Sequence, residues 1–247
     1  MKNDRLTALD VLTNAPWLKG LAPGLPEILV KEGRLERYPA GRWRQAAGDP
    51  GNGVTAIIEG AVALYCQGSA NQVAQFMQVG PGAAFGHSLF TGGGSNVTAV
   101  CVEPTLVLSV SQPAIQRLSE SEPELLSAVV RLAYLNARTL LQQIADLIGL
   151  PARQRLAASL LQLSQGKSRG WITVGQGALA EMIGVTRKTA SQFLTEFERE
   201  GWVELGRNRL RILDRVALAR ALQGCDEIDA PNCSRADPVQ AESPERG

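Results

Sequence analysis

Six polar side chains suited to binding nucleic-acid bases and phosphates gather in one seven-residue segment of the C-terminal third. They are Thr186, Arg187, Lys188, Thr189, Ser191 and Gln192. Apolar residues recur around them at helical spacing and predict a helix over 187–199 with the polar set on its opposite face. Arginine can donate two hydrogen bonds to guanine, and glutamine pairs in a similar way with adenine. The predicted chemistry is therefore recognition of base edges and phosphates.

The residues before this helix predict the partner that positions it. Apolar residues at 179, 182 and 183 indicate a helix over 176–183, and Gly184 supplies the turn because glycine enters left-handed backbone geometry without steric cost. Thr186 stands where an N-cap is expected. Two helices joined in this way form a helix-turn-helix, whose second helix presents its N-terminal polar face to the major groove.

A basic hairpin is predicted directly after the second helix. Residues 202–205 and 210–213 have the composition of short strands, and Gly206-Arg207-Asn208-Arg209 joins them. We expect Arg207 and Arg209 to contact phosphates. A simpler alternative is a small helical subdomain with a solvated charged face, but a capped helix, a turn glycine and a basic hairpin would then coincide by chance.

The charge of the chain is unevenly distributed. Residues 151–223 carry 12 Lys/Arg against 6 Asp/Glu, a net charge of +6, whereas residues 1–150 carry −1 and residues 224–247 carry −4. A basic C-terminal domain favours nucleic-acid binding by that part alone. Neither a membrane-spanning apolar run nor a signal-peptide core is apparent, so we expect a cytoplasmic protein without membrane contact.

The four cysteines predict no cofactor. Cys66, Cys101, Cys225 and Cys233 fall singly, whereas a structural zinc or an iron–sulfur cluster needs clustered ligands. A redox-active pair remains open. We also expect no enzyme activity, because neither a nucleophile–base pair nor a phosphate-binding loop is present.

The N-terminal half is predicted to be a strand domain behind a few short helices. Residues 4–38 indicate short helices broken at prolines and glycines. Strand-length apolar runs then recur at 54–58, 61–65, 73–77, 97–102 and 106–110, with glycine-containing turns between most of them. This pattern predicts an antiparallel barrel or sandwich and an α+β fold class overall. Whether the barrel encloses a pocket is left open by the pattern.

A long helix over 123–149 is predicted to connect the two halves. It carries one stripe of Leu125, Val129, Leu132, Leu140, Ile144 and Leu147, and a second of Leu126, Ala133, Ala137, Leu141 and Ile148. One face can cover the barrel, and the other predicts self-association into a homodimer. The alternative is a helix enclosed between the chain's own two domains. Further helices are expected over 152–165 and 215–222, the latter capped by Asp214, and residues 224–247 are expected to be disordered.

This order of elements resembles the Crp/Fnr family of bacterial transcription regulators. The resemblance covers roughly residues 15–223 and is strongest in LAEMIGVTRKTASQFLTEFEREGWVELGRNRLRILD, with IIEGAVALY and VGPGAAFG at family-like positions. It implies a jelly-roll-like, cyclic-nucleotide-binding-type β-roll over 1–120, a dimerisation helix over 121–150 and a winged helix-turn-helix over 151–223. The acidic tail over 224–247 is expected from composition alone. The resemblance further implies a homodimer that reads a near-palindromic operator in double-stranded DNA, with RNA polymerase as a further candidate partner.

The effector segment FGHSLFTGGGSNVTAV departs from that family. Cyclic-nucleotide-binding members carry a Gly-Glu pair and, further on, an arginine for the cyclic phosphate. Here Gly86 is kept, but His87, followed by Ser88, stands where the glutamate is expected. Val97, followed by Thr98, stands where the arginine is expected. A phosphate buried without its cation is strongly disfavoured. We therefore expect that cyclic AMP is not bound in the usual pose; an unrelated effector, or none, remains open.

His87 also raises other possibilities, because it is the only histidine in the chain. It suggests a ligand or heme site, although a hydrogen-bonded turn residue is the simpler interpretation. The iron–sulfur mode of some relatives is not expected, since no cysteine cluster precedes the barrel.

The recognition helix departs from the family as well. Many members show Arg-Glu-Thr-Val-Ser-Arg where this chain shows Arg-Lys-Thr-Ala-Ser-Gln. Lys188 donates where the glutamate accepts from cytosine, and Gln192 suits adenine better than guanine. We therefore expect an operator that differs from the family's common half-site. An alternative function is a ligand-binding or protein-interaction module whose helix-turn-helix does not read DNA, but the +6 charge argues against it.

Overall fold

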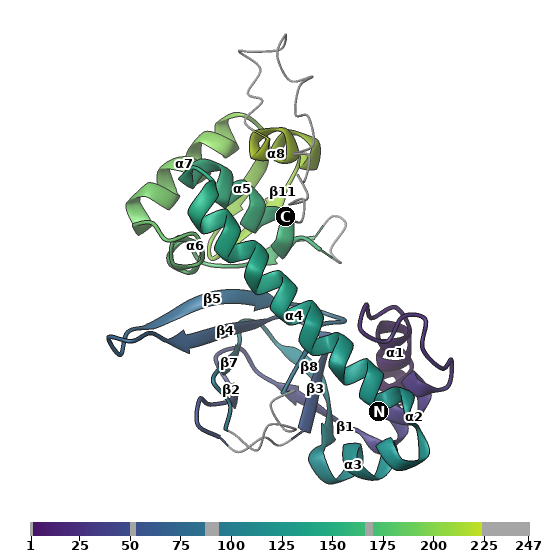
Figure 1. The fold of residues 1–247 in the computed structure, drawn as a ribbon. Helices are drawn as coiled ribbons and strands as arrows, with labels where there is room; N and C mark the ends of the chain where they lie inside the picture. Colours follow the sequence, from purple (N-terminus) through teal and green to yellow (C-terminus); the bar gives the residue numbers. More distant parts are fainter. Residues whose placement is uncertain (1, 50–52, 87–93, 166–169, 224–247) are drawn as a thin grey trace, which may run out of the picture.

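Two lobes joined by one long helix make up the computed structural model, which describes residues 2–49, 53–86, 94–165 and 170–223 (Figure 1). The connecting helix, α4 (Glu124–Gly149), runs along the N-terminal lobe and ends at the C-terminal one. Within the described residues no helix combines the length and apolar character needed to cross a membrane.

The N-terminal lobe is built on two four-stranded sheets whose neighbouring strands are antiparallel. One sheet has the order β1 (Arg34–Tyr38), β8 (Thr105–Ser111), β3 (Gly53–Glu59) and β6 (Ala84–Phe85). The other has the order β2 (Trp43–Gln45), β7 (Thr98–Cys101), β4 (Val62–Gln67) and β5 (Val73–Val79). This arrangement confirms the predicted jelly-roll-like β-roll.

Strand β3 shows how the roll separates two apolar cores. Successive side chains of a strand point to opposite faces. Val54, Ala56 and Ile58 therefore pack with the helices outside the roll, whereas Ile57 packs with Val62, Phe85 and other residues between the sheets. Both faces of the strand are buried, so its sequence is continuously apolar.

The turn between β3 and β4 depends on a glycine. Gly60 has φ +84°, and a Cβ there would lie 2.6 Å from the Pro104 carbonyl oxygen. Only glycine combines this backbone conformation with so close an approach.

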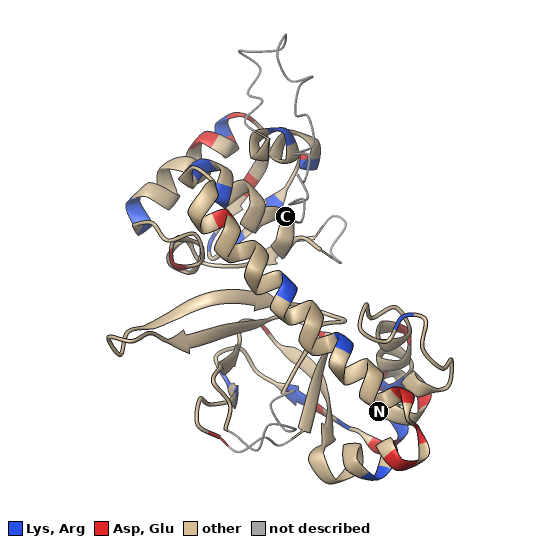
Figure 2. Cartoon of the chain, in the orientation of Figure 1, with Lys and Arg blue, Asp and Glu red and all other residues tan. Residues whose placement is uncertain are grey.

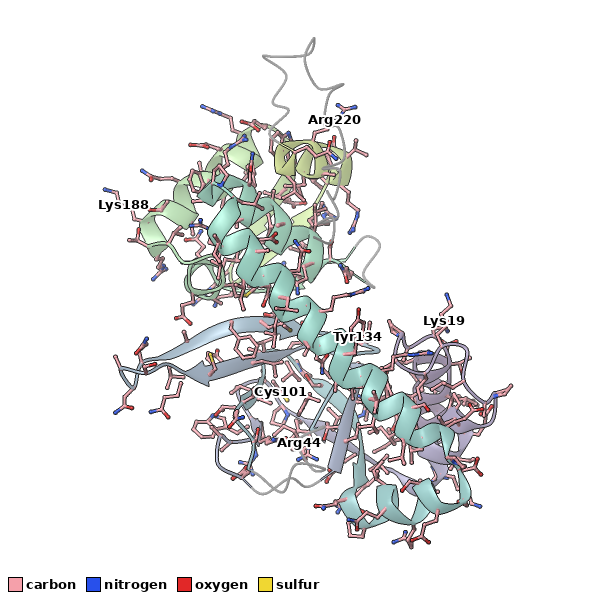
Figure 3. All side chains as sticks on the ribbon, viewed as in Figure 1. Lys19, Arg44, Cys101, Tyr134, Lys188 and Arg220 are labelled. Atoms are coloured by element: carbon pink, nitrogen blue, oxygen red, sulfur yellow. The ribbon has the colours of Figure 1, made fainter. Side chains whose placement is uncertain are left out.

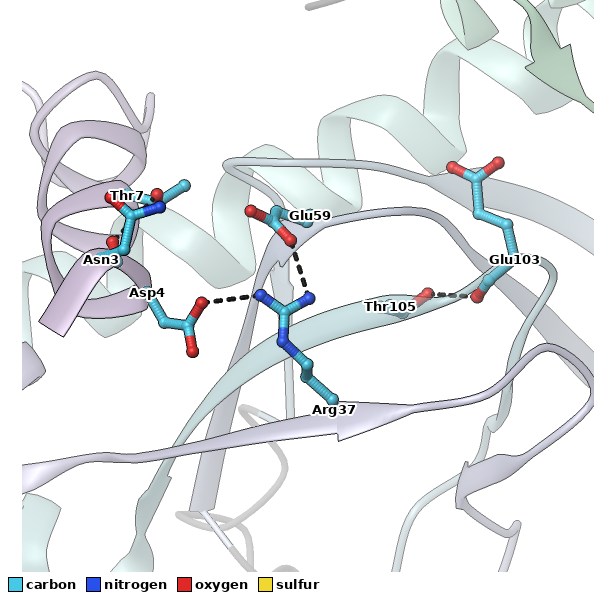
Figure 4. Close-up of polar contacts among 7 residues, drawn as sticks. All are labelled: Asn3, Asp4, Thr7, Arg37, Glu59, Glu103 and Thr105. Atoms are coloured by element: carbon cyan, nitrogen blue, oxygen red, sulfur yellow. Dashed lines mark hydrogen bonds and ion pairs between the residues drawn. The ribbon is translucent and has the colours of Figure 1, made fainter. Parts of the chain in front are cut away.

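Three helices cover the outer face of the first sheet. These are α1 (Lys2–Thr13), α2 (Leu25–Glu32) and α3 (Gln112–Ser121), and α4 joins them in one core through Leu125, Ala128, Val129 and Leu132. Arg37 ties α1 to the sheet through Asp4 Oδ1 at 2.7 Å and Glu59 Oε2 at 3.0 Å (Figure 4). The hydrogen bond from Arg37 lowers the pKa of the Asp4 carboxyl.

Several elements of this lobe differ from the sequence prediction. Residues 34–38 form a strand where short helices were expected, because five residues of β1 pair with β8. Strands β2 and β6 and helix α3 were not predicted at all. The two strands have three and two residues, too few to show a period, and they are held by pairing with distant strands.

Helix α4 is apolar on two faces, as predicted, but Leu140, Ile144 and Leu147, which were predicted on the same stripe as Leu125, are exposed. Leu125, Val129 and Leu132 are buried against the lobe. A second stripe is exposed and runs the length of the helix: Leu126, Val130, Tyr134, Leu141, Ile144 and Ile148. We call these six residues the α4 stripe. Its exposure argues against the alternative that α4 is enclosed between the chain's own domains.

The C-terminal lobe is a winged helix-turn-helix. It comprises α5 (Ala152–Leu163), β9 (Ile172–Thr173), α6 (Gln176–Met182), α7 (Arg187–Arg199), β10 (Val203–Gly206), β11 (Arg209–Ile212) and α8 (Arg215–Leu222). The three strands form one antiparallel sheet in the order β10-β11-β9. Leu156, Leu160, Leu194 and Phe197 lie at the centre of its core. The predicted fold class is confirmed.

Candidate nucleic-acid interface and effector region

The turn between α6 and α7 has the geometry that its sequence predicts. Gly184 has φ +65°, and the Val185 amide donates to the Ala180 carbonyl at 3.0 Å. Ala180 is 3% exposed, and its small side chain lets α7 pack close to α6. The turn therefore sets the angle between the two helices.

Helix α7 is fixed at its start and along its inner face. The Thr186 hydroxyl accepts a hydrogen bond from the Thr189 amide at 3.1 Å, which confirms the predicted N-cap. Ala190, Leu194 and Phe197 are buried in the lobe. Arg153 stacks over the Phe197 and Trp202 rings at 5.1 and 5.0 Å and pairs with Glu200. A helix held in this way presents its other face in a defined orientation.

The outer face of α7 carries the predicted polar set. Arg187, Lys188 and Gln192 are exposed, and Thr189 and Ser191 are half-buried. Lys188 points away from the lobe (Figure 3). Within the part of the chain that the structure describes, no carboxylate pairs with Arg187 or Lys188. The two cations are therefore available to an anionic partner.

Charge is polarised along α7. Figure 2 shows basic residues at its N-terminal end and, toward its C-terminal end, acidic residues together with Arg199. The acidic residues make intramolecular contacts: Glu196 and Glu200 pair with Arg153, and Glu198 accepts from the Leu205 amide at 2.9 Å. The carboxylates are thus held apart from the basic end.

The hairpin, or wing, carries Arg207 and Arg209 at its tip, both exposed. The turn is closed by Asn208 at φ +54°, a conformation that asparagine tolerates. The Arg209 guanidinium lies 4.3 Å from the centre of the Trp171 ring, while Arg211 lies 5.3 Å from it and pairs with Glu204. Trp171 therefore orients Arg209, a role that the sequence prediction missed. Trp171 lies beside Arg209 because β9 pairs with β11, and the sequence analysis predicts no strand at residues 172–173.

The helix-turn-helix is also bound to the β-roll of the same chain. Glu181 Oε2 in α6 accepts from the Gln75 amide of edge strand β5 at 2.7 Å. The Gln78 side chain donates to the Thr173 carbonyl at 2.9 Å, and the Thr173 hydroxyl donates to Glu103 at 2.5 Å. These contacts hold the recognition helix in one orientation relative to the roll.

The predicted effector segment is described only at its two ends. His87 and Ser88 lie outside the described residues. Gly86 has φ +93°, and a Cβ there would lie 2.2 Å from the Gly53 carbonyl oxygen, so this position requires glycine. Val97 packs against the apolar cluster between the sheets, which includes Phe85. The Thr98 hydroxyl accepts from the Ala47 amide at 3.0 Å.

Nothing among the described residues forms a metal centre. No group of three or more His, Cys, Asp or Glu side chains in residues 2–49, 53–86, 94–165 and 170–223 could hold an ion. Cys66 and Cys101 are free thiols, and burial raises the pKa of Cys101. Cys225 and Cys233 lie outside the described residues.

Two family models match the chain, one in each lobe. Residues 35–122 match the cyclic nucleotide-binding domain, and residues 154–221 match the Crp-like helix-turn-helix domain.

Most of the chain is similar in sequence to two curated regulators, and its fold is similar to that of a solved structure. The chain is 26% identical to the CRP-like cAMP-activated global transcriptional regulator of Mycobacterium tuberculosis, over 85% of this chain and 98% of that protein. It is 28% identical to the cyclic AMP receptor protein of Thermus thermophilus, over 84% and 96%. The structure of FixK2 from Bradyrhizobium japonicum has the same fold, with a TM-score of 0.68 and 18% identity over 76% of this chain and 96% of that one.

Proposed function

The chain belongs to the Crp/Fnr family of DNA-binding transcription regulators, and from that premise we propose that it acts as a homodimer on a near-palindromic operator. The families matched are those of a regulator and not of an enzyme. The proposed division of roles follows the predicted boundaries: residues 1–120 receive an effector, 121–150 dimerise and 151–223 bind DNA.

The outer face of α7 is the observation that carries this proposal. Arg187, Lys188 and Gln192 project from a capped helix whose opposite face is buried. Such a helix can enter a major groove and place long donors at base edges. Arg207 and Arg209 on the wing would contact the phosphates beside that groove, and Thr186, Thr189 and Ser191 would contact the backbone or bases near the helix start.

The α4 stripe supports the dimer. A two-fold pair of α4 helices would cover these apolar side chains, and the two recognition helices would then read half-sites about 34–36 Å apart, one turn of DNA. We also propose RNA polymerase as a partner of the DNA-bound dimer, to be tested by transcription in vitro from a promoter that carries the operator.

Capture of fragmented genomic DNA by the purified protein, with no ligand added, tests the proposed function. We expect a two-fold symmetric site to be enriched and binding to weaken steeply with salt. The double variant Arg187→Ala/Lys188→Ala is the matched control and should enrich nothing. If folded, dimeric wild-type protein captured no sequence preferentially, DNA recognition without effector would be refuted. Binding that is independent of salt would instead favour the protein-interaction alternative.

We propose further that cyclic AMP is not the effector in its usual pose. Val97 is packed among apolar side chains, and valine has no donors for a phosphate. Titration calorimetry should detect no saturable cyclic AMP binding to the wild type. Binding at micromolar concentration would contradict this proposal.

A further inference from the structure

Arg44 crosses the interior of the β-roll from one sheet to the other. It lies on β2, and its Nη2 donates to the Ser109 hydroxyl of β8 at 2.7 Å. Its Cζ lies 5.9 Å from the centre of the Tyr38 ring on β1. Strands β1 and β8 belong to the sheet opposite β2. Figure 3 shows Arg44 in the roll near Cys101. The guanidinium therefore lies between the two sheets.

A bulge in β2 directs this side chain inward. Trp43 pairs with Val100 and Gln45 with Ala99, so Arg44 is the extra residue where the register shifts. Bulges redirect a side chain and are common beside functional sites. The positive charge of Arg44 acts on the Cys101 thiol and the Tyr38 phenol. Burial raises the pKa of both groups, and the Arg44 charge opposes that rise in both.

Among the described residues, the positive charge of Arg44 has no partner of opposite sign. No carboxylate in residues 2–49, 53–86, 94–165 or 170–223 forms an ion pair with it. Its Nε is shielded from solvent and finds no acceptor there. The acidic residue nearest in sequence, Asp49, instead accepts from the Ala46 amide at 2.7 Å. A buried donor on a charged group is costly when left unpaired.

A purely structural role explains only part of this geometry. The bond to Ser109 and the contact with Tyr38 tie the two sheets together, and an uncharged donor could make the same bond. Neither contact uses Nε. A guanidinium fork with unused donors is the group that proteins place against a carboxylate or a phosphate.

We propose that Arg44 binds a carboxylate or phosphate group of a small effector inside the β-roll. This proposal rests on the proposed role of the roll as the effector domain. Strand β2 pairs with β7, which begins directly after Val97. Tyr38, beneath Arg44, packs against the same apolar cluster as Val97. In this proposal Arg44 on β2 supplies the cation that position 97 lacks. It does so from a different place in the roll, and therefore for an anion held in a different geometry.

Thermal unfolding of the full chain with two anionic probes tests the proposal. Inorganic phosphate and succinate are titrated separately at constant ionic strength, with chloride as the balance. We expect one of them to raise Tm by about 5 °C in a saturable way. Phosphate responding alone would indicate a phosphorylated effector, and succinate alone a carboxylic acid. No saturable shift with either probe would overturn the proposal.

Matched variants separate a specific site from a general salt effect. Arg44→Gln should abolish the shift, whereas Arg42→Gln should keep it, because Arg42 carries the same charge but is exposed. Arg44→Lys keeps the charge without the fork and should weaken the apparent affinity at least about 5-fold; it also serves if Arg44→Gln does not fold. Equal shifts in all four proteins would refute the site. Since no DNA is present, failure here is distinct from failure of operator binding.

Discussion

Arg187 is the residue on which operator specificity should depend most. It stands in the first turn of α7, exposed and without an acidic partner among the described residues. Arg187→Ala should relax the preference for guanine at one operator position and cost about 1–3 kcal/mol of binding free energy there. Binding to an operator series with each base at that position measures this. An equal loss on every sequence would make Arg187 a phosphate contact instead.

Arg207 should act through charge alone. It is exposed at the wing tip, where a phosphate contact carries no base information. Arg207→Ala should lower affinity for all sequences alike and reduce the slope of log K against log salt by about 1. Arg220→Ala is the matched control, because it removes the same charge from an exposed position on α8, away from Lys188 (Figure 3). A slope that falls equally in both variants would show a non-specific charge effect.

At the scale of single elements, the contact between α6 and β5 is a specific and testable link between the lobes. Edge strand β5 leaves backbone groups that need partners, and the Glu181 carboxylate accepts from the Gln75 amide. Glu181→Ala should speed hydrogen exchange at that amide by about 10-fold, as expected when a charge-assisted bond worth about 1.5–3 kcal/mol is lost. Glu198→Ala, which removes a carboxylate bonded within the C-terminal lobe, should leave that amide unchanged.

The sequence predicted those elements whose signals are local. Thr186, the helical spacing and the turn glycine all lie within α7 or beside it, and the predicted bounds 187–199 match the helix in the structure. Strand β1 was missed because it is a strand only through its pairing with β8, about 70 residues away in the chain. The stacking of Arg209 on Trp171 was missed for the same reason, since it depends on the pairing of β9 with β11.

The candidate effector site shows the same division more sharply. The absence of a phosphate arginine at position 97 was evident from the sequence, whereas the orientation of Arg44 was not. Nothing in the pattern around Trp43-Arg44-Gln45 marks a bulge, because the register shift is defined only against β7. The burial of Arg44 Nε without an acceptor depends on how β2 lies against β1 and β8 of the other sheet. No short stretch of sequence indicates it.

At the scale of the whole molecule, a single chain leaves the apolar α4 stripe uncovered. Tyr134, Leu141 and Ile148 are 64%, 66% and 83% exposed, and they follow one another at seven-residue intervals. That repeat is the one by which two helices pack along a common seam. A contiguous apolar surface of this kind on a folded chain marks an interface. In the proposed dimer the two-fold axis would run along α4, and both recognition helices could then face one DNA duplex.

Breaking this seam should therefore uncouple folding from DNA recognition. Leu141→Glu/Ile144→Glu would bury two charges at the interface and should give a monomer of 26.4 kDa by analytical ultracentrifugation. Each lobe keeps its own core, so the circular dichroism spectrum should be unchanged. Operator affinity should fall by at least about 100-fold, because one chain reads only one half-site.

Gln142→Glu, at an exposed position between Leu141 and Ile144, is the control and should remain dimeric. A double variant that stayed dimeric would place the interface elsewhere, and a monomer that bound the full operator as tightly as the wild type would refute two-fold reading.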